Sequence, residues 1–371
     1  MFSKTSLALF FLLLSFSAAL AGQPTIAAIG PLTGRTAYLG TNFFQSLRYS
    51  VDALNQDGGL LGQKVRLVEI DNQSTPEGSS QAVRQAIAQN VDCVIGPLLS
   101  SKAIILAREL QEAGIPMIAP IATAPGVTRV GDYIFRICFT DAFQGHALAH
   151  FAGRQLHARE AAVLIQKNEL YSQSLADAFE TSLEGYQGKV VFTGEYSAGQ
   201  KDFTALLKQA IKHGMDVLMI PGYPKEAARI IDQVRAMGYG GPIIGGDGWS
   251  KRMAEFTKDT GNLRNCYEIR HFSRSTGNDI ARRFLKGFEA RYGTIEQDSA
   301  ALAHDALLAY THAVQAAGSL DRKKVMQALK RVSFQGATGN ISFDAQGDPQ
   351  KSAMVITYTG GAPQYFMVLE P

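Results

Sequence analysis

The feature that most constrains the fold of this chain is a regular alternation between short apolar runs and longer segments with helical periodicity. Thr25–Ile29 is an apolar run of strand length. Asn42–Asn55 follows with apolar residues three and four positions apart, which is typical of an amphipathic helix. Thr75 and Pro76 then supply the N-cap and first-turn signals of a further helix. This alternation predicts parallel sheets that are covered by helices on both faces.

The alternation falls into two series, the second of which starts directly after Asp141. A chain of 371 residues is also too long for one hydrophobic core. We therefore predict an α/β protein with two doubly wound, Rossmann-like lobes. The predicted strands are 25–29, 64–70, 93–95, 116–119, 161–165, 189–194, 216–220, 242–245, 340–343, 354–358 and 365–369, and the predicted helices are 42–55, 76–90, 101–113, 142–157, 172–184, 202–213, 224–237, 278–292, 298–317 and 321–331.

The N-terminus predicts export. Lys4 precedes an apolar run, Leu7–Phe16, and small residues at Ala19 and Ala21 stand before Gly22. This order is typical of a secretory signal peptide over residues 1–21. The run is shorter than the roughly 20 residues that a membrane-spanning helix needs, although an uncleaved anchor is the alternative. No cysteine follows the cleavage point, so we expect a soluble periplasmic protein without a lipid anchor.

Charge and cysteine content exclude some functions. The 36 Lys and Arg residues and 33 Asp and Glu residues are interspersed, which gives no support for nucleic-acid binding. Three cysteines, Cys93, Cys138 and Cys266, allow at most one internal disulfide. Cys93 and Cys138 are the pair to expect if one forms, but a core of this size needs no covalent link and we predict three buried thiols.

Polar residues gather in the loops that follow the predicted strands, where open parallel sheets bind their ligands. The first-lobe loops are rich in hydroxyls and lead into helices, whose N-termini favour a carboxylate. The second-lobe loops carry two tyrosines and Asp247, which can hold an ammonium group. A zwitterion could therefore bridge the lobes. The loops are 96–101 and 120–125 in the first lobe, and 166–171, 221–224 and 245–249 in the second.

Signatures of catalysis and metal binding are missing from the sequence. It contains no G-x-S-x-G, P-loop, G-x-G-x-x-G or H-E-x-x-H motif, and none of the five loops carries a histidine. His146 and His150 have helical spacing but no third ligand at a fixed spacing, so we expect no bound metal. We predict neither a cofactor nor an enzyme, with a hydrolase as the alternative.

The order of several motifs resembles the periplasmic leucine/isoleucine/valine-binding protein family. The motifs are GPLTGRTAYLG, NQDGGLLGQKVRLVEIDNQSTP, VIGPLLSS, GIPMIAPIATAP, KDF, PGYPKEAARIIDQVRAMG and IIGGDGW, and they span nearly the whole chain after the signal peptide. The resemblance implies a type I periplasmic binding protein whose lobes are joined by a three-strand hinge. It places residues 22–141 and 271–345 in the N-terminal lobe, and residues 142–270 and 346–371 in the C-terminal lobe.

The resemblance also implies ligand contacts. Ser100 and Thr123 match hydroxyls that hold a ligand carboxylate, and Ile121 and Ala122 match the neighbouring backbone groups. Asp247 matches an acid that receives the ammonium, usually a longer glutamate in this family. The further candidates are Tyr171 and Tyr223, which would close over the ligand, Leu99 in place of a common cysteine, Trp249 beside Asp247, and Tyr38 and Arg35 in the first loop.

The implied function is solute binding for an ABC transporter. The lobes would close on an amino acid or related small carboxylate and deliver it to an inner-membrane permease, and we expect a monomer. Ala300 and Ala301 stand where an aromatic pocket residue is usual, which would admit a bulkier or aromatic side chain. The alternative is a sensor of amides, urea or aromatic acids that acts with a separate receptor or regulator.

Overall fold

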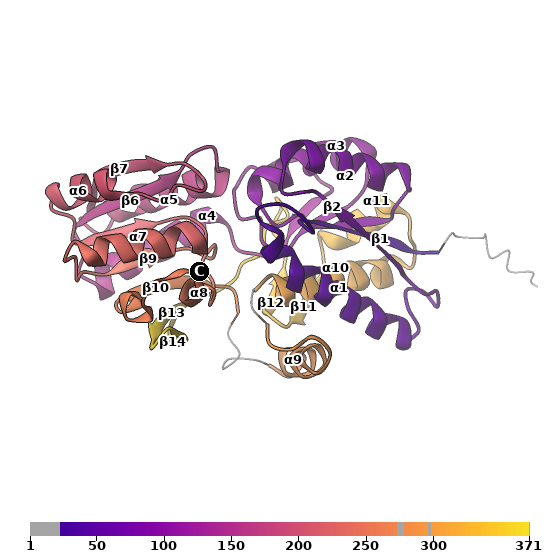
Figure 1. Ribbon diagram of the computed structural model, residues 1–371. Helices are drawn as coiled ribbons and strands as arrows, with labels where there is room; N and C mark the ends of the chain where they lie inside the picture. The colour runs from indigo at the N-terminus through magenta and orange to yellow at the C-terminus, as the bar shows by residue number, and fades with distance from the viewer. Residues whose placement is uncertain (1–22, 273–277, 296–297, 371) are drawn as a thin grey trace, which may run out of the picture.

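The computed structural model describes residues 23–272, 278–295 and 298–370, and it shows two lobes side by side (Figure 1). The predicted signal peptide lies outside the described residues. Within the described ranges, no helix combines the length and apolar character that crossing a bilayer requires.

The first lobe is built on a sheet of five parallel strands in the order β2-β1-β3-β4-β5. This is one of the two common orders of doubly wound folds, and it changes direction between β1 and β3. The strands are β1 (Thr25–Gly30), β2 (Arg66–Asp71), β3 (Cys93–Ile95), β4 (Met117–Ala119) and β5 (Ile134–Arg136), and the helices are α1 (Ala37–Gln56), α2 (Pro76–Ala88), α3 (Ser100–Ala113), α9 (Asp279–Tyr292), α10 (Ser299–Ala317) and α11 (Arg322–Leu329). A short hairpin, β11 (Ser333–Gly336) and β12 (Gly339–Ser342), follows α11.

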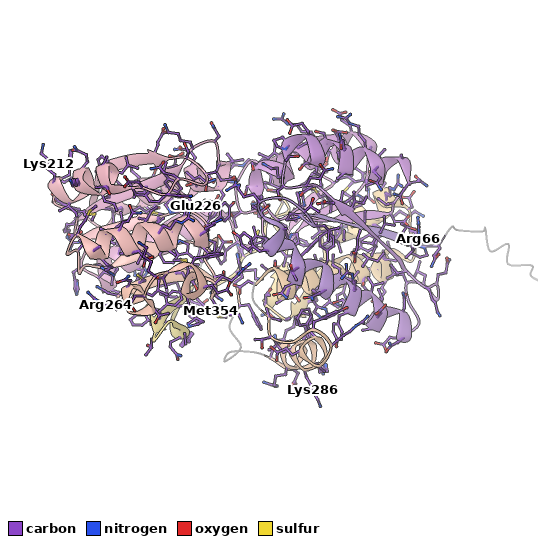
Figure 2. The ribbon with its side chains drawn as sticks, viewed as in Figure 1. Arg66, Lys212, Glu226, Arg264, Lys286 and Met354 are labelled. Atoms are coloured by element: carbon purple, nitrogen blue, oxygen red, sulfur yellow. The ribbon has the colours of Figure 1, made fainter. Side chains whose placement is uncertain are left out.

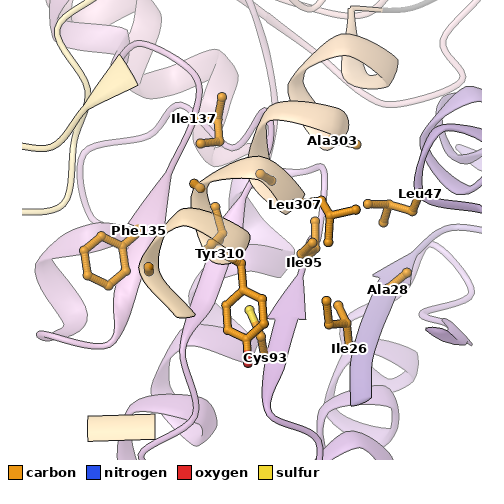
Figure 3. Packing of buried hydrophobic residues seen from close by; sticks show 14 of the residues in the cluster. Ile26, Ala28, Leu47, Cys93, Ile95, Phe135, Ile137, Ala303, Leu307 and Tyr310 are labelled. Atoms are coloured by element: carbon orange, nitrogen blue, oxygen red, sulfur yellow. The ribbon is translucent and has the colours of Figure 1, made fainter. Parts of the chain in front are cut away.

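Alternating side chains of the first sheet enter two separate cores. Ile26 on β1 faces α1 and α10, where it joins a cluster with Leu47 and Leu307 (Figure 3). Ala27, the next residue, belongs to the opposite cluster with residues of α2 and α3 such as Leu106. The period of two along the strand therefore buries both faces of the sheet under helices, as the alternation of the sequence predicts.

The second lobe repeats this strand order. Its parallel strands run β7-β6-β8-β9-β10, and two antiparallel strands, β13 and β14, extend the sheet beyond β10. The strands are β6 (Glu160–Gln166), β7 (Lys189–Tyr196), β8 (Val217–Ile220), β9 (Ile243–Gly245), β10 (Cys266–Arg270), β13 (Ala353–Thr359) and β14 (Ala362–Leu369), and the helices are α4 (Asp141–His150), α5 (Leu170–Glu184), α6 (Thr204–Lys212), α7 (Pro224–Ala236) and α8 (Met253–Phe256).

The chain passes between the two sheets in three places: between β5 and α4, between β10 and α9, and between β12 and β13. The first and third connections are tied together by Arg136, whose fully buried Nε donates to Asp348 Oδ1 at 2.5 Å. The same guanidinium donates to the carbonyl of Ala122 at 2.8 Å. The predicted crossings near 141, 271 and 345 fall in or beside these connections.

Local differences from the sequence predictions have physical causes. The helix predicted over 142–157 is interrupted, because α4 passes into a π-helical turn at Phe151–Gln155. Three strands were not predicted: β5 carries a buried arginine, β10 alternates apolar residues with Glu268 and Arg270, and β11 alternates without a strong apolar run. The three cysteines are buried and unpaired, which confirms the prediction of three thiols.

Candidate functional site

A pocket lies between the lobes and is lined by residues from both. They sit at the carboxyl ends of strands or at the helix starts that follow, which is where doubly wound sheets place their ligands. The lining residues are Leu39, Leu98, Leu99, Ser100, Ile121 and Ser299 from the first lobe, and Tyr171, Tyr223, Asp247 and Gly248 from the second.

The first-lobe wall is apolar apart from two hydroxyls, of which Ser100 is the one that the sequence predicts. Ser100 is the first residue of α3, is 2% exposed, and accepts a hydrogen bond from the backbone N–H of Ala124 at 3.2 Å. Its hydroxyl proton stays available for a ligand. The N-terminus of α3 adds the positive end of a 14-residue helix, so this point of the wall suits an anion.

The second-lobe wall carries Tyr171 and Tyr223, whose ring centroids are 5.7 Å apart. The Tyr171 hydroxyl accepts a hydrogen bond from the backbone N–H of Gly248 at 2.8 Å, which fixes the ring against the loop after β9. Burial raises the pKa of both phenols well above the ordinary value of 10.0, and the nearby carboxylates raise it further. The two tyrosines therefore stay protonated and offer donors rather than charges.

Asp247 is held on both of its carboxylate oxygens. Gln144 Nε2 donates to Oδ1 at 3.1 Å, and the Gln144 side-chain oxygen accepts the backbone N–H of Asp247 at 2.6 Å. His271 Nε2 lies 2.8 Å from Oδ2, and its ring stacks on Phe139 at a centroid distance of 3.6 Å. Each carboxylate oxygen has two acceptor sites, so Asp247 can still accept hydrogen bonds from a ligand.

Gln144 and His271 were missed by the sequence analysis. Gln144 lies on α4, three residues after the predicted crossing, and His271 follows β10 rather than any of the five loops considered. Because β10 lies beside β9 in the sheet, the residue after β10 comes close to the loop after β9. The sequence separation of 24 residues carries no signal of this contact.

The glycines around Asp247 are required by close packing. A Cβ atom on Gly246 would lie 2.5 Å from both the Gln144 side-chain oxygen and the Tyr171 hydroxyl. A Cβ atom on Gly248 would lie 2.7 Å from the carbonyl of Gly222. Side chains at either position would push the aspartate loop away from its partners, so the Gly-Asp-Gly sequence here serves the site as well as the turn.

Asp141 lies behind Asp247 and is fully buried. Ser174 donates to one of its oxygens, and Gln144 Nε2 lies 3.3 Å from the other. Burial is the largest cause that raises the pKa of Asp141 from 3.8 to about 7, and the nearby Asp247 raises it further. At neutral pH a substantial share of Asp141 is therefore protonated, which limits the negative charge beside Asp247.

The structure brings six of the eleven candidate residues to the pocket and five elsewhere. Arg35 is exposed and does not line the pocket. Ala122 and Thr123 are fully buried and do not line the pocket. Trp249 packs in the core of the second lobe and donates its ring N–H to Ile220. Tyr38 lies under Arg252 of the second lobe, with the guanidinium 4.8 Å from the ring centroid. The six that line it are Leu99, Ser100, Ile121, Tyr171, Tyr223 and Asp247.

The pocket wall near residue 300 differs from the sequence argument. Ala300 and Ala301 are fully buried in a cluster with Phe284 and Phe288 and do not line the pocket. Ser299 faces the pocket instead. The two alanines therefore do not enlarge the pocket as we inferred from the sequence. Ser299 is a pocket residue that sequence reasoning missed.

Groups of three or more metal-ligating side chains are not found within the described ranges. His146 and His150 lie around the ring of Tyr186, with centroid distances of 6.0 and 5.5 Å.

A family model described as "Periplasmic binding protein" matches residues 23–362. The chain belongs to this family. The match confirms the resemblance drawn from the sequence motifs. Among the relatives, the Leu/Ile/Val-binding protein BraC3 of Rhizobium johnstonii is 32% identical over 227 residues, which are 61% of this chain and 62% of that protein's own length.

Solved structures of periplasmic binding proteins confirm the predicted fold. The leucine-binding protein LivK of Thermotoga maritima has a TM-score of 0.89 and 29% identity, and the match covers 94% of this chain and 99% of that one. LivJ of Streptococcus pneumoniae, solved in complex with isoleucine, has a TM-score of 0.87 and 29% identity, with 94% and 100% covered.

At the rim of the pocket, this periplasmic binding protein has direct contacts between its lobes. Ser101 on α3 donates to the carboxylate of Glu169, which precedes α5, at 3.2 Å. Arg252 covers the ring of Tyr38 across the gap. Glu226, at the start of α7, lies on the side of the second lobe that faces the first, while Lys212 lies at the far end (Figure 2). The Ser101–Glu169 and Tyr38–Arg252 contacts hold the two walls of the pocket close together.

Proposed function

We propose that this chain binds an amino acid between its lobes and delivers it to an inner-membrane ABC permease. The observation that carries the proposal is the pairing of two walls around one pocket: a hydroxyl at a helix N-terminus, Ser100, faces a carboxylate, Asp247. The two charged ends of an α-amino acid fit these two points, because the carboxylate suits the N-terminus of α3 and the ammonium suits Asp247.

The remaining lining residues indicate what kind of side chain the ligand carries. Leu39, Leu98 and Ile121 form the apolar part of the first wall. An aliphatic side chain placed against them would be removed from water, which stabilises the complex by roughly 25 cal/mol per Å² of buried apolar surface. Binding of isoleucine by the similar LivJ protein supports an amino acid with an uncharged side chain as the ligand class.

Binding would act through hinge closure. A ligand that contacts both walls favours the closed arrangement of the lobes by its differential affinity for it. The three connections between the sheets supply the hinge, and the rim contacts Ser101–Glu169 and Tyr38–Arg252 form only when the walls are close. A permease would then distinguish the loaded from the empty protein by the relative position of the lobes.

One observation favours a second candidate ligand. Both oxygens of Asp247 already have partners in the protein, Gln144 and His271. A carboxylate satisfied in this way has less need of an ammonium, so a monocarboxylate without one, such as an aromatic acid, is the second candidate. We favour the amino acid because Asp247 keeps unused acceptor sites and lies directly on the pocket.

The proposal can be tested with the chain from residue 22 onward, purified and freed of bound ligand by unfolding and refolding. Thermal shift followed by calorimetry would compare the common amino acids with benzoate and urea. A ligand at 100 times its Kd adds about 2.7 kcal/mol of stability. We expect one or more amino acids to bind, and we expect no binding of benzoate or urea. Binding of benzoate or urea with no response to any amino acid would reject the proposal.

A further inference from the structure

Ser299 lines the pocket and has a buried hydroxyl without a hydrogen-bond partner among the described residues. The residue is 2% exposed, it lines the pocket, and no donor or acceptor within residues 23–272, 278–295 and 298–370 pairs with its Oγ. Buried hydroxyls are nearly always paired, because leaving one unpaired loses the hydrogen bonds that water would make. An unpaired hydroxyl on a ligand pocket therefore indicates a partner that arrives with the ligand.

The position of Ser299 is fixed by the packing of its helix. It is the first residue of α10, which is 19 residues long and starts at the pocket. The Ser46 hydroxyl donates to the carbonyl of Ala300 at 2.6 Å, and the backbone N–H of His271 donates to Asp298 at 3.0 Å. Both neighbours of Ser299 are thus anchored, and the N-terminal end of α10 adds a partial positive charge that favours an acceptor atom.

The polar groups assigned to the ligand's charged ends lie on other elements. Ser100 lies on α3 and Asp247 follows β9, whereas Ser299 belongs to α10, which packs on α1, the helix that carries the apolar lining residue Leu39. Once the carboxylate and the ammonium of an amino acid are held at Ser100 and Asp247, what remains to meet Ser299 is the ligand's side chain.

We infer that Ser299 is a specificity residue that selects an amino acid with an oxygen-bearing side chain, a hydroxyl or an amide, over an aliphatic one of the same shape. The inference rests on the proposed function and adds the class of side chain. An aliphatic side chain would close the pocket and leave the Ser299 hydroxyl unpaired, whereas a hydroxyl or amide oxygen would accept its proton. One hydrogen bond of this kind corresponds to about a tenfold difference in affinity.

The test uses pairs of amino acids that share a shape and differ in polarity: threonine with valine, and asparagine with leucine. Calorimetry would measure all four with the wild type, with Ser299→Ala, and with Ser299→Thr, which keeps the hydroxyl. Thr311→Val is the matched control, because Thr311 carries a buried hydroxyl on the same helix that also has no partner in the described part of the chain but does not line the pocket.

We expect the wild type to prefer the polar member of at least one pair by about tenfold. Ser299→Ala should remove that preference by weakening the polar member, while Ser299→Thr and Thr311→Val should keep it. A wild type that prefers the aliphatic member of both pairs would overturn the inference, and so would a preference that survives Ser299→Ala or is equally lost in Thr311→Val. If none of the four amino acids binds while another amino acid does, this inference fails and the proposed function stands.

Discussion

The two walls of the pocket achieve polarity by different means. The first-lobe wall is mostly aliphatic, and its predicted anchor is a neutral hydroxyl, Ser100, supported by the N-terminus of a helix. The second-lobe wall holds a formal charge, Asp247, inside a network of side chains that includes Gln144, His271 and Asp141. The first wall therefore depends on backbone groups that any helix supplies, whereas the second depends on particular side chains brought together by the fold.

This difference predicts that the walls respond unequally to mutation and to pH. Backbone donors and a neutral hydroxyl do not titrate in the physiological range, so the first wall should be insensitive to pH. Substitutions in the second wall either remove a buried charge or leave a buried charge without its partner. Such substitutions are among the most damaging changes to a protein.

The largest expected effect is that of Asp247→Ala on amino-acid affinity. An ammonium group bound in the pocket would lose its charged partner, which costs about 3–5 kcal/mol, or roughly 200-fold or more in Kd. Ser100→Ala removes one hydroxyl and leaves the N-terminus of α3, so its loss should be about tenfold. Calorimetry on both variants checks the comparison, with Asp202→Ala, an exposed loop aspartate, as control. Equal losses from the two walls would contradict it.

The next effect concerns stability rather than affinity and comes from Asp141. Its pKa is raised from 3.8 to about 7, so the folded state holds a proton that the unfolded state has already released in this window. Stability from this group is therefore greatest at low pH and falls as the pH rises from about 4 to 7. The loss between pH 5 and 7.5 is on the order of 2–3 kcal/mol.

Asp141→Asn should remove this contribution, because asparagine does not titrate. Urea unfolding at pH 5 and pH 7.5 would measure it as a difference between wild type and variant. A variant whose stability changes with pH as much as that of the wild type would show that Asp141 is ionised in the folded protein throughout this range.

A smaller effect is expected from His271→Ala. The histidine positions Asp247 through Oδ2, and removing it leaves Gln144 as the remaining side-chain partner. Loss of one hydrogen bond to a charged group corresponds to about 1.5–3 kcal/mol, or at least tenfold in amino-acid affinity. His271→Asn, which retains a donor, should recover part of the loss. If His271→Ala binds as tightly as the wild type, Asp247 needs no such positioning.

The smallest effect is that of Tyr171→Phe on stability. The substitution removes the hydroxyl that accepts the Gly248 N–H and leaves the ring in place. We expect a loss of about 1 kcal/mol in the free energy of unfolding. Tyr365→Phe, on an exposed tyrosine of β14, is the control and should change nothing measurable. A Tyr171→Phe variant as stable as this control would mean that the hydrogen bond contributes no net stability.

Much of the fold could be predicted because periodicity and cap signals are local. The strand predicted at 93–95 matches β3, and the predicted cap Thr75 accepts the backbone N–H of Gly78. β5 was missed because its stability depends on distant partners. It contains Arg136, which is tolerated in the interior only because Asp348, on another connection, neutralises it. No pattern within residues 134–136 reveals that partner.

The residues of the site also divide into those that local sequence signals predict and those that depend on distant partners. Asp247 lies in a loop directly after a strand, and Ser100 and Tyr171 lie at the helix starts that follow such loops, so the rule for parallel sheets and the motif order together found them. His271 reaches Asp247 through strand pairing, and Ser299 reaches the pocket through the packing of α10 on α1. Those contacts are tertiary, and a single sequence holds no spacing that predicts them.

A crystal structure of the protein grown with its tightest-binding amino acid tests the central claim most directly, because it shows which wall holds which end of the ligand. We predict the ligand carboxylate within hydrogen-bonding distance of Ser100 at the start of α3, and the ammonium within hydrogen-bonding distance of Asp247. A ligand that touches only one lobe, or one bound with its two charged ends exchanged, would contradict the account.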